Sequence, residues 1–178
     1  AETRRRAKAI NFGIVYGISA FRLGRQLGIP TGRAAEYIDG YFKRYAGVKR
    51  FIDETIALAH ERGFVTTMFG RRRFLSDINA RNRNLQMNAE RIAVNTPLQG
   101  SAADLIKLAM VHIDARLDRE RLASRMILQV HDELVFEVPD TERDVMEALV
   151  REEMEGAATL KVPLRVSLGI GRTWADVH

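Results

Sequence analysis

Residues 126–138 read MILQVHDELVFEV, a stretch in which two apolar runs flank the polar residues His131, Asp132 and Glu133. Both runs are rich in Val, Leu, Ile and Phe and are short enough to be strands. The pattern predicts a β-hairpin that turns at the polar residues. Asp and Glu favour solvated turns, so the turn has a plain structural interpretation. Carboxylates held on a stiff hairpin also suit a metal ion, which makes Asp132 a candidate ligand.

The composition of the chain is that of a globular protein. Its 178 residues are 46% hydrophobic, enough for a core in one or two compact units. No apolar run approaches the roughly 20 residues that cross a bilayer, and the first ten residues lack the apolar stretch of a secretory signal. Cysteine is absent, and the four histidines show no zinc-ligand spacing. We therefore expect a cytoplasmic protein without a membrane partner.

The charge is distributed unevenly along the chain. Residues 1–83 carry 17 Lys and Arg against 7 Asp and Glu, a net charge of +10. Residues 84–178 carry 11 against 16, a net charge of −5. A basic first half could attract a polyanion, although solvated helix faces are the alternative interpretation.

The first half of the chain has helical patterns. Glycines, Ser19 and Pro30 separate four expected helices, at 3–17, 20–28, 31–46 and 48–62. Residues 64–75 are then expected to form a short hairpin that turns at Gly70, with Arg71, Arg72 and Arg73 after the turn.

The second half mixes helices and strands. A long helix from about residue 82 to 117 is expected to be kinked or divided at Thr96–Pro97. The hairpin of 126–138 follows, then a helix at 140–157 and an alternating closing strand at 164–170. The whole chain therefore predicts an α+β fold: a helical region at 1–81, and at 82–178 a small antiparallel sheet covered by helices.

The first expected helix carries a four-residue periodicity. Arg4, Lys8, Phe12 and Tyr16 fall on one slowly drifting helix face, with two cations followed by two aromatic rings. A nucleotide has the matching polarity, because cations bind phosphates and a ring can stack on a base. A basic helix end followed by core aromatics is the alternative.

Several longer motifs carry a family resemblance. RRRAKAINFGIVYG (4–17) resembles motif B, and QVHDELVFEVP (129–139) motif C, of the family A DNA polymerases, the bacterial polymerase I group. Stretches between and after them also resemble this family in the right order, namely GRRRFL (70–75), AERIAVNTPLQGSAADLIKLAM (89–110) and VPLRVSLGIGRTW (162–174). The resemblance implies a DNA-directed polymerase of replication or repair, with fingers at 1–81 and part of the palm at 82–178.

The resemblance also implies roles for residues of the fingers. Arg4 and Lys8 would contact the triphosphate of the incoming deoxynucleotide, and Lys8 would be a candidate proton donor to pyrophosphate. Phe12 would pack against the sugar and base, and Tyr16 would stand near the templating position.

Other residues would contact the primer–template. Arg91, Asn95 and Gln99 would face the DNA, with Gln99 and His131 directed at the minor groove, although a structural salt bridge is an equal alternative for Arg91. The three arginines at 71–73 would touch the DNA backbone, or else form a solvated hairpin edge.

Asp132 would ligate catalytic Mg²⁺, with Glu133 as an accessory carboxylate, in two-metal nucleotidyl transfer. A second aspartate belongs to motif A of the family, with a sequence like DYSQIELR, and this chain contains no such string. We therefore expect a C-terminal piece of a larger polymerase that is inactive alone, needs the missing upstream part and can self-associate through unpaired strand edges. A non-catalytic nucleotide- or duplex-DNA-binding module and a structural helical domain are the alternatives.

Overall fold

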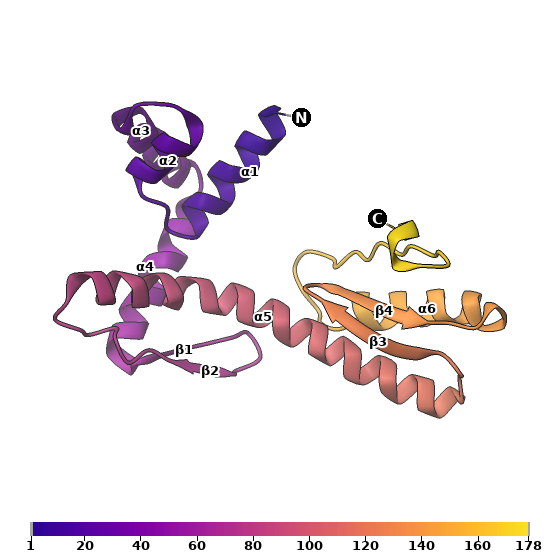
Figure 1. The fold of residues 1–178 in the computed structure, drawn as a ribbon. Helices are drawn as coiled ribbons and strands as arrows, with labels where there is room; N and C mark the ends of the chain where they lie inside the picture. The colour runs from indigo at the N-terminus through magenta and orange to yellow at the C-terminus, as the bar shows by residue number, and fades with distance from the viewer. Residues whose placement is uncertain (1, 178) are drawn as a thin grey trace. The chain divides into compact units, whose positions relative to one another are not determined.

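The computed structural model describes the backbone of residues 2–177 and the side chains of residues 4, 7, 8 and 10–176. Helices dominate, and two short antiparallel hairpins complete an α+β fold, as the sequence predicts (Figure 1). In chain order the elements are α1 (Glu2–Val15), α2 (Ala20–Leu27), α3 (Thr31–Arg44), α4 (Ala46–Arg62), β1 (Phe64–Thr66), β2 (Arg72–Phe74), α5 (Arg83–Glu120), β3 (Arg125–Val130), β4 (Glu133–Glu137), the 3-10 turn η1 (Asp140–Glu142), α6 (Arg143–Glu155) and the 3-10 turn η2 (Trp174–Val177).

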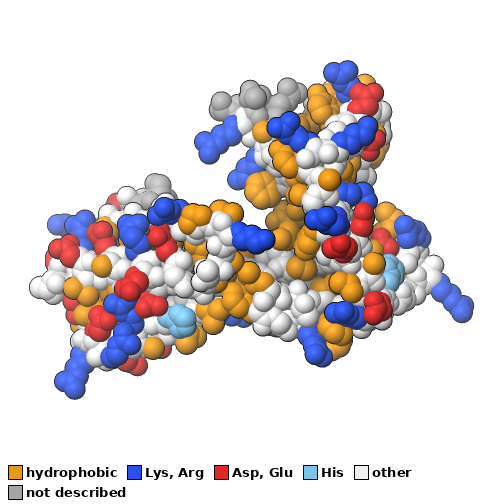
Figure 2. All heavy atoms as spheres, turned by 180° about the vertical axis from the view of Figure 1, so that it is seen from behind, with side chains coloured by type: hydrophobic (Ala, Val, Ile, Leu, Met, Phe, Trp, Pro, Cys, Tyr) orange, Lys and Arg blue, Asp and Glu red, His pale blue; other side chains and the backbone are white. Residues whose placement is uncertain are grey.

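The chain folds as two compact units, Ala1–Gln99 and Gly100–His178. The sequence places the boundary at 81/82 instead, before α5. The structural boundary lies later because Ala89 and Ala93 of α5 are buried in the core of the first unit. Charged side chains intersperse with apolar ones on the surface shown in Figure 2. No helix within the described residues is long and apolar enough to cross a membrane.

The first unit has two apolar clusters. Leu23 and Leu27 of α2 pack with Ala34 of α3, and Ile10 and Ile18 complete that cluster. The second cluster joins α4, the β1–β2 hairpin and the first half of α5, through Ala59, Val65, Leu75, Ile78, Ala89 and Ala93. The first cluster places the C-terminal half of α1 against α2, which is the arrangement that shapes the candidate site.

Local signals in the sequence set the helix ends of this unit. The Oγ of Ser19 accepts a hydrogen bond from the backbone N–H of Arg22, which satisfies a free donor of the first turn of α2. Gly28 ends α2 with a φ of 67°, and Gly63 ends α4 with a φ of 73°. Glycine adopts this left-handed conformation without the steric cost of a Cβ atom.

α5 is one helix of 38 residues that continues through Pro97. The division of this helix at Thr96–Pro97, one of the two predicted outcomes, is therefore wrong. Proline lacks the N–H that would bond to the carbonyl of Ala93, one turn earlier. The neighbouring Thr96 donates a 2.7 Å hydrogen bond from its Oγ1 to the carbonyl of Ile92, so its hydroxyl stays within the helix.

The second unit is a hairpin packed on two helices. Ile113 and Leu117 of α5 pack with three residues of α6, Met146, Leu149 and Val150. Met126, Leu134 and Phe136 cover this cluster from the β3–β4 hairpin. The unit therefore builds its core from the C-terminal half of α5, from α6 and from one face of the hairpin.

Residues 164–170 do not form the predicted closing strand. The alternation is present, because Leu164, Val166 and Leu168 are half-buried while the residues between them are exposed. No strand among the described residues pairs with the segment, however. Side chains of α6 bind its backbone instead: Glu155 accepts from the N–H of Val166, and Arg151 donates to the carbonyl of Val166. Alternation sets which side chains are buried, but a ladder also needs a second strand.

Candidate nucleotide and nucleic-acid interface

The predicted stripe on α1 forms an exposed face. The rings of Phe12 and Tyr16 stack with centroids 6.2 Å apart and an interplanar angle of 18°. The ammonium of Lys8 lies 5.7 Å from the centroid of the Phe12 ring, and Arg4 is exposed one turn earlier. The alternative interpretation required core aromatics, but the side chain of Phe12 is 51% exposed and therefore does not belong to the core. Exposed cations, the exposed ring of Phe12 and the half-buried ring of Tyr16 therefore occur on one helix face.

The two glycines of the motif have different structural roles. A Cβ atom on Gly13 would meet the Ile18 side chain at 3.2 Å, so Gly13 allows the segment after α1 to fold back against the helix. Gly17 has a φ of 76°, the left-handed conformation that ends the helix. Gly13 thus serves a close approach of two segments, whereas Gly17 ends the helix.

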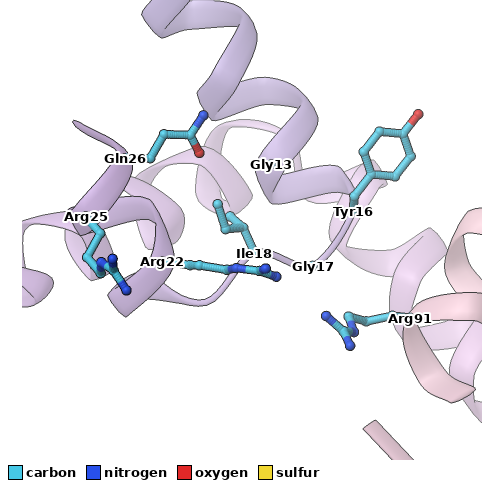
Figure 3. Close-up of a pocket in the computed structure, with 8 residues that line it drawn as sticks. All are labelled: Gly13, Tyr16, Gly17, Ile18, Arg22, Arg25, Gln26 and Arg91. Carbon is cyan, nitrogen blue, oxygen red and sulfur yellow. The ribbon is translucent and has the colours of Figure 1, made fainter. Parts of the chain in front are cut away.

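A pocket of about 630 Å³ lies beside the end of α1 (Figure 3). Tyr16 contributes to its wall, and three arginines line it: Arg22 and Arg25 from α2 and Arg91 from α5. Figure 3 shows Arg22 and Arg91 extending into it from opposite sides. All the lining residues belong to the first unit, and none carries a negative charge. Such a pocket suits an anionic ligand with an apolar or aromatic part.

The sequence did not identify Arg22 and Arg25 as site residues. They lie three positions apart on α2, which places them on one helix face. That spacing was a usable signal, but only the packing of α2 against α1 brings them to Tyr16. The guanidinium of Arg25 also lies 5.9 Å from the ring centroid of Phe21, which is exposed.

Arg91, Asn95 and Gln99 follow one another on α5 at four-residue intervals, within the first unit. Arg91 is exposed and donates a hydrogen bond to Asn88, and it forms no ion pair with any residue that the structure describes. The alternative of a structural salt bridge therefore lacks support. The buried Oδ1 of Asn95 has no hydrogen-bond partner among the described residues. A buried acceptor without a partner is costly to the fold.

The predicted arginine hairpin forms as expected. β1 pairs with β2 in antiparallel register, and Gly70 adopts a φ of 82° in the turn. The side chains of the three arginines at 71–73 are all exposed. This leaves their predicted contact with DNA open, because a solvated edge has the same exposure.

The hairpin with the candidate metal ligand forms as predicted, with β3 and β4 antiparallel and Val130 paired with Glu133. His131 and Asp132 make its two-residue turn, and His131 adopts a φ of 55°. The side-chain amide of Gln129 donates to the carbonyl of His131 and holds the turn. His131, Asp132 and Glu133 are all exposed, so the two carboxylates can reach a ligand outside the hairpin.

Two polar clusters hold the scaffold under this hairpin. The carboxylate of Glu142 accepts three hydrogen bonds, from the N–H of Ala123 and from the N–H and Oγ of Ser124, just before β3 begins. The hydroxyl of Ser124 is the main reason that the pKa of Glu142 is below its ordinary value, and the Ala123 N–H adds to it.

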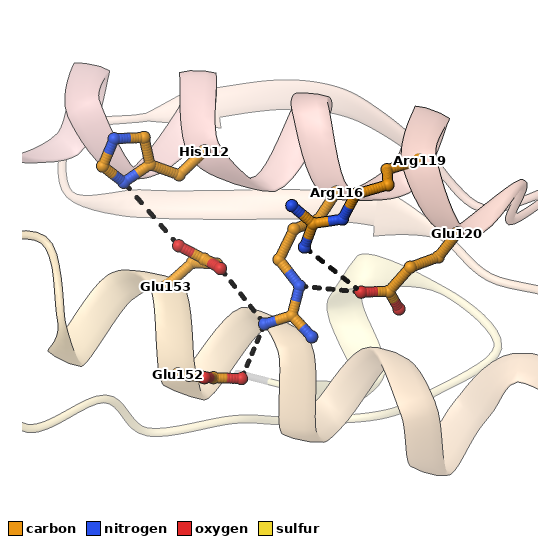
Figure 4. A network of polar contacts seen from close by, with 6 residues as sticks. All are labelled: His112, Arg116, Arg119, Glu120, Glu152 and Glu153. Atoms are coloured by element: carbon orange, nitrogen blue, oxygen red, sulfur yellow. Dashed lines mark hydrogen bonds and ion pairs between the residues drawn. The ribbon is translucent and has the colours of Figure 1, made fainter.

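The second cluster joins α5 to α6 (Figure 4). Arg116 binds Glu152 at 2.6 Å, Glu120 at 2.9 Å and Glu153 at 3.1 Å, and His112 lies 3.6 Å from Glu153. Hydrogen bonds to these carboxylates, that of Glu152 foremost, raise the pKa of Arg116 above its ordinary value. The cluster links the two helices on which the hairpin packs.

The described residues contain no group of three or more His, Cys, Asp or Glu side chains placed to hold a metal ion. Asp132 and Glu133 supply oxygen donors of the kind that Mg²⁺ prefers, but a closed site needs more ligands than these two. The donor set therefore fits magnesium in kind and is incomplete in number.

Comparisons with known proteins agree with the motifs. The family model of DNA polymerase family A matches residues 1–176. The chain is 53% identical over 173 residues to DNA polymerase I of Bacillus caldotenax, covering 97% of this chain and 20% of the relative. It is 50% identical over 173 residues to DNA polymerase I of Mycobacterium tuberculosis, covering 97% of this chain and 19% of the relative. The chain thus spans about a fifth of the length of these curated relatives.

A solved structure has the same fold. It is the POL domain of Pol1 from M. smegmatis, in complex with DNA primer-template and dNTP, at 45% identity and a TM-score of 0.96. The match covers 99% of this chain and 31% of that chain. The resemblance that the motifs carry is confirmed along nearly the whole sequence, and the chain belongs to DNA polymerase family A.

Proposed function

We propose that this chain supplies the nucleotide-binding fingers and part of the palm of a template-directed DNA polymerase. The observation that carries the proposal is the exposed face of α1, where Lys8, Phe12 and Tyr16 follow one another at ring and cation contact distances. A similar domain was solved with DNA primer-template and dNTP, which supports the same partners here.

The residues of α1 would act on the incoming nucleotide. Arg4 and Lys8 would bind the triphosphate, and Lys8 would donate a proton to the departing pyrophosphate as negative charge develops there. Phe12 would pack on the sugar and base. Tyr16 forms part of the wall of the arginine-lined pocket, so that pocket would receive the template nucleotide and its phosphate.

Residues of both units would contact the primer–template. Gln99 and His131 are exposed, as a donor to minor-groove acceptors must be. Arg91 would bind the DNA backbone from the pocket, and Asn95, four residues later on α5, would face the primer–template. The arginines of the β1–β2 hairpin would add backbone contacts.

Asp132 would hold Mg²⁺, with Glu133 as the accessory carboxylate. Magnesium bound there would activate the primer 3′-hydroxyl and stabilise the leaving group, as in two-metal nucleotidyl transfer. Because the chain carries one of the two aspartates that the family uses, we propose that it does not extend primers by itself. Magnesium-dependent extension by this chain that is lost in Asp132→Asn would overturn that part of the proposal.

A titration with fluorescent primer–template and deoxynucleotide tests the binding function, with and without magnesium. We expect the correct nucleotide to tighten the complex more than an incorrect one. Lys8→Gln should weaken nucleotide binding about tenfold, because a charge-assisted contact to phosphate contributes roughly 1.5–3 kcal/mol. Lys43→Gln is the matched control, since it removes an exposed lysine of α3 outside the site.

Two outcomes contradict the proposal. If DNA binds but the correct nucleotide has no effect, the chain is a duplex-binding module. If neither DNA nor nucleotide binds, the chain is a structural domain.

A further inference from the structure

The β1–β2 hairpin has two unlike faces. Its register pairs Phe64 with Phe74 and Thr66 with Arg72, so these four side chains share one face. Val65 and the adjoining Leu75 point the other way and are buried in the core with α4 and α5. The face of Phe64 and Phe74 is therefore turned away from the core of its own unit, and we call it the outer face.

An aromatic ring stands open on the outer face. Phe74 is 74% exposed, although it is a large apolar side chain. Its ring is supported on one side by Phe64, with centroids 5.7 Å apart and an interplanar angle of 58°. The guanidinium of Arg72 in turn lies over the Phe64 ring, 5.0 Å from the ring centroid. The ring is thus held in place while much of its surface remains free to accept another flat group.

The charge around this ring is positive. Arg72 is exposed and forms no ion pair with any residue that the structure describes, whereas Arg73, paired with Val65, points to the other face of the hairpin. An open aromatic ring beside an arginine without an ion pair is a combination by which proteins hold single-stranded nucleic acid, because bases stack on the ring while cations bind the phosphates. A duplex does not offer this contact, since its base faces are already stacked on one another.

We propose that the outer face of the β1–β2 hairpin binds single-stranded DNA, with one base stacked on Phe74 and a neighbouring phosphate bound by Arg72. The inference rests on the proposed function, because a template-directed polymerase must hold unpaired template. It adds a subsite for the unpaired strand that is distinct from the arginine-lined pocket, to which no residue of this hairpin contributes.

The test measures fluorescence anisotropy of a labelled oligo-dT strand with the chain, in the absence of magnesium, primer and nucleotide. Phe74→Leu keeps an apolar side chain but removes the ring, and it should weaken binding roughly fivefold or more, the loss of one base stack. Phe74→Trp should keep the affinity within about twofold, because indole also stacks. Tyr37→Ala is the matched control, an exposed aromatic of α3, and it should bind as the unaltered chain does.

Circular dichroism would check that each variant is folded, which the exposure of Phe74 leads us to expect. Equal affinity of Phe74→Leu and the unaltered chain overturns the proposal. So does a result in which Arg72→Gln weakens binding and Phe74→Leu does not, since the contact would then be purely electrostatic. If Phe74→Leu weakens a blunt duplex as much as oligo-dT, the face is not specific for single strands. The proposed function can fail independently, because its test reads the effect of a nucleotide on a paired primer–template.

Discussion

The carboxylate of Glu142, at the start of α6, accepts hydrogen bonds from both the N–H and the Oγ of Ser124, at 2.9 and 2.6 Å. Ser124 is buried and immediately precedes β3, the strand that leads to His131 and Asp132. One side chain thus ties the start of the motif C hairpin to the helix beneath it.

This contact predicts a pH-dependent contribution to stability. The pKa of Glu142 is lowered on folding, chiefly by the Ser124 hydroxyl, so the carboxylate stabilises the fold fully above its ordinary pKa of 4.5. That stabilisation is lost as the pH falls below 4.5 through the lower pKa of the folded state. Glu142→Gln should therefore lower the urea midpoint at neutral pH, and the difference from the unaltered chain should shrink in acid.

Glu147→Gln is the control for this measurement, since Glu147 forms an exposed pair with Arg143 on the same helix at 3.5 Å. Exposed pairs of this kind contribute little, so its midpoint should stay close to that of the unaltered chain. A Glu142→Gln effect of the same size at neutral and acid pH would contradict the prediction.

Truncating a buried side chain in the core of the second unit should cause a large loss of stability. Ile113 is fully buried against α6, and Ile113→Ala should lower the free energy of unfolding by about 2–5 kcal/mol through lost contacts and a new cavity. Val111→Ala, two residues earlier and 64% exposed, should change it by less than about 0.5 kcal/mol. Urea unfolding followed by circular dichroism measures both, and similar losses for the two variants would refute the assigned packing.

Replacing either of two helical glycines by alanine should change the stability of the chain, in opposite directions for the two positions. A Cβ atom on Gly24 would lie 2.8 Å from the carbonyl oxygen of Ile29, so Gly24→Ala should destabilise the chain by about 1–3 kcal/mol. Gly40 lies within α3 with nothing within 4 Å of its added Cβ, so Gly40→Ala should stabilise it by about 0.5–1 kcal/mol. Thermal unfolding of the pair measures the difference, and a stabilising Gly24→Ala would show that the approach of α2 to Ile29 is looser than described.

The arginine-lined pocket predicts a salt-dependent contact with DNA. If Arg22 binds one phosphate, Arg22→Gln should reduce the slope of log affinity against log salt by about 0.7–0.9 and weaken binding at low salt. Arg33→Gln, which removes an exposed arginine of α3 outside the pocket, should leave the slope unchanged. Anisotropy titrations over several salt concentrations supply the slopes. An unchanged slope in Arg22→Gln would remove this residue from the interface.

The local features of the fold could be predicted from the sequence. The four-residue intervals of α1 place Lys8, Phe12 and Tyr16 on one face, and the polar residues between two apolar runs place a turn at His131 and Asp132. Ser19 and Gly28 likewise define the ends of α2. These features depend on helix and strand periodicity and on capping, which act between residues close in sequence. The family motifs are equally a property of the sequence alone, because each is a run of neighbouring residues.

Contacts between distant segments were decided by the tertiary structure. Arg22 and Arg25 meet Arg91 around one pocket only because α2 and α5 both pack near the end of α1. Residues 164–170 alternate like a strand but bind side chains of α6, because a strand needs a partner that its own sequence cannot provide. The exposure of Phe74 likewise follows from which hairpin face packs on α4 and α5. Periodicity determines which side chains share a face, whereas packing determines what that face meets.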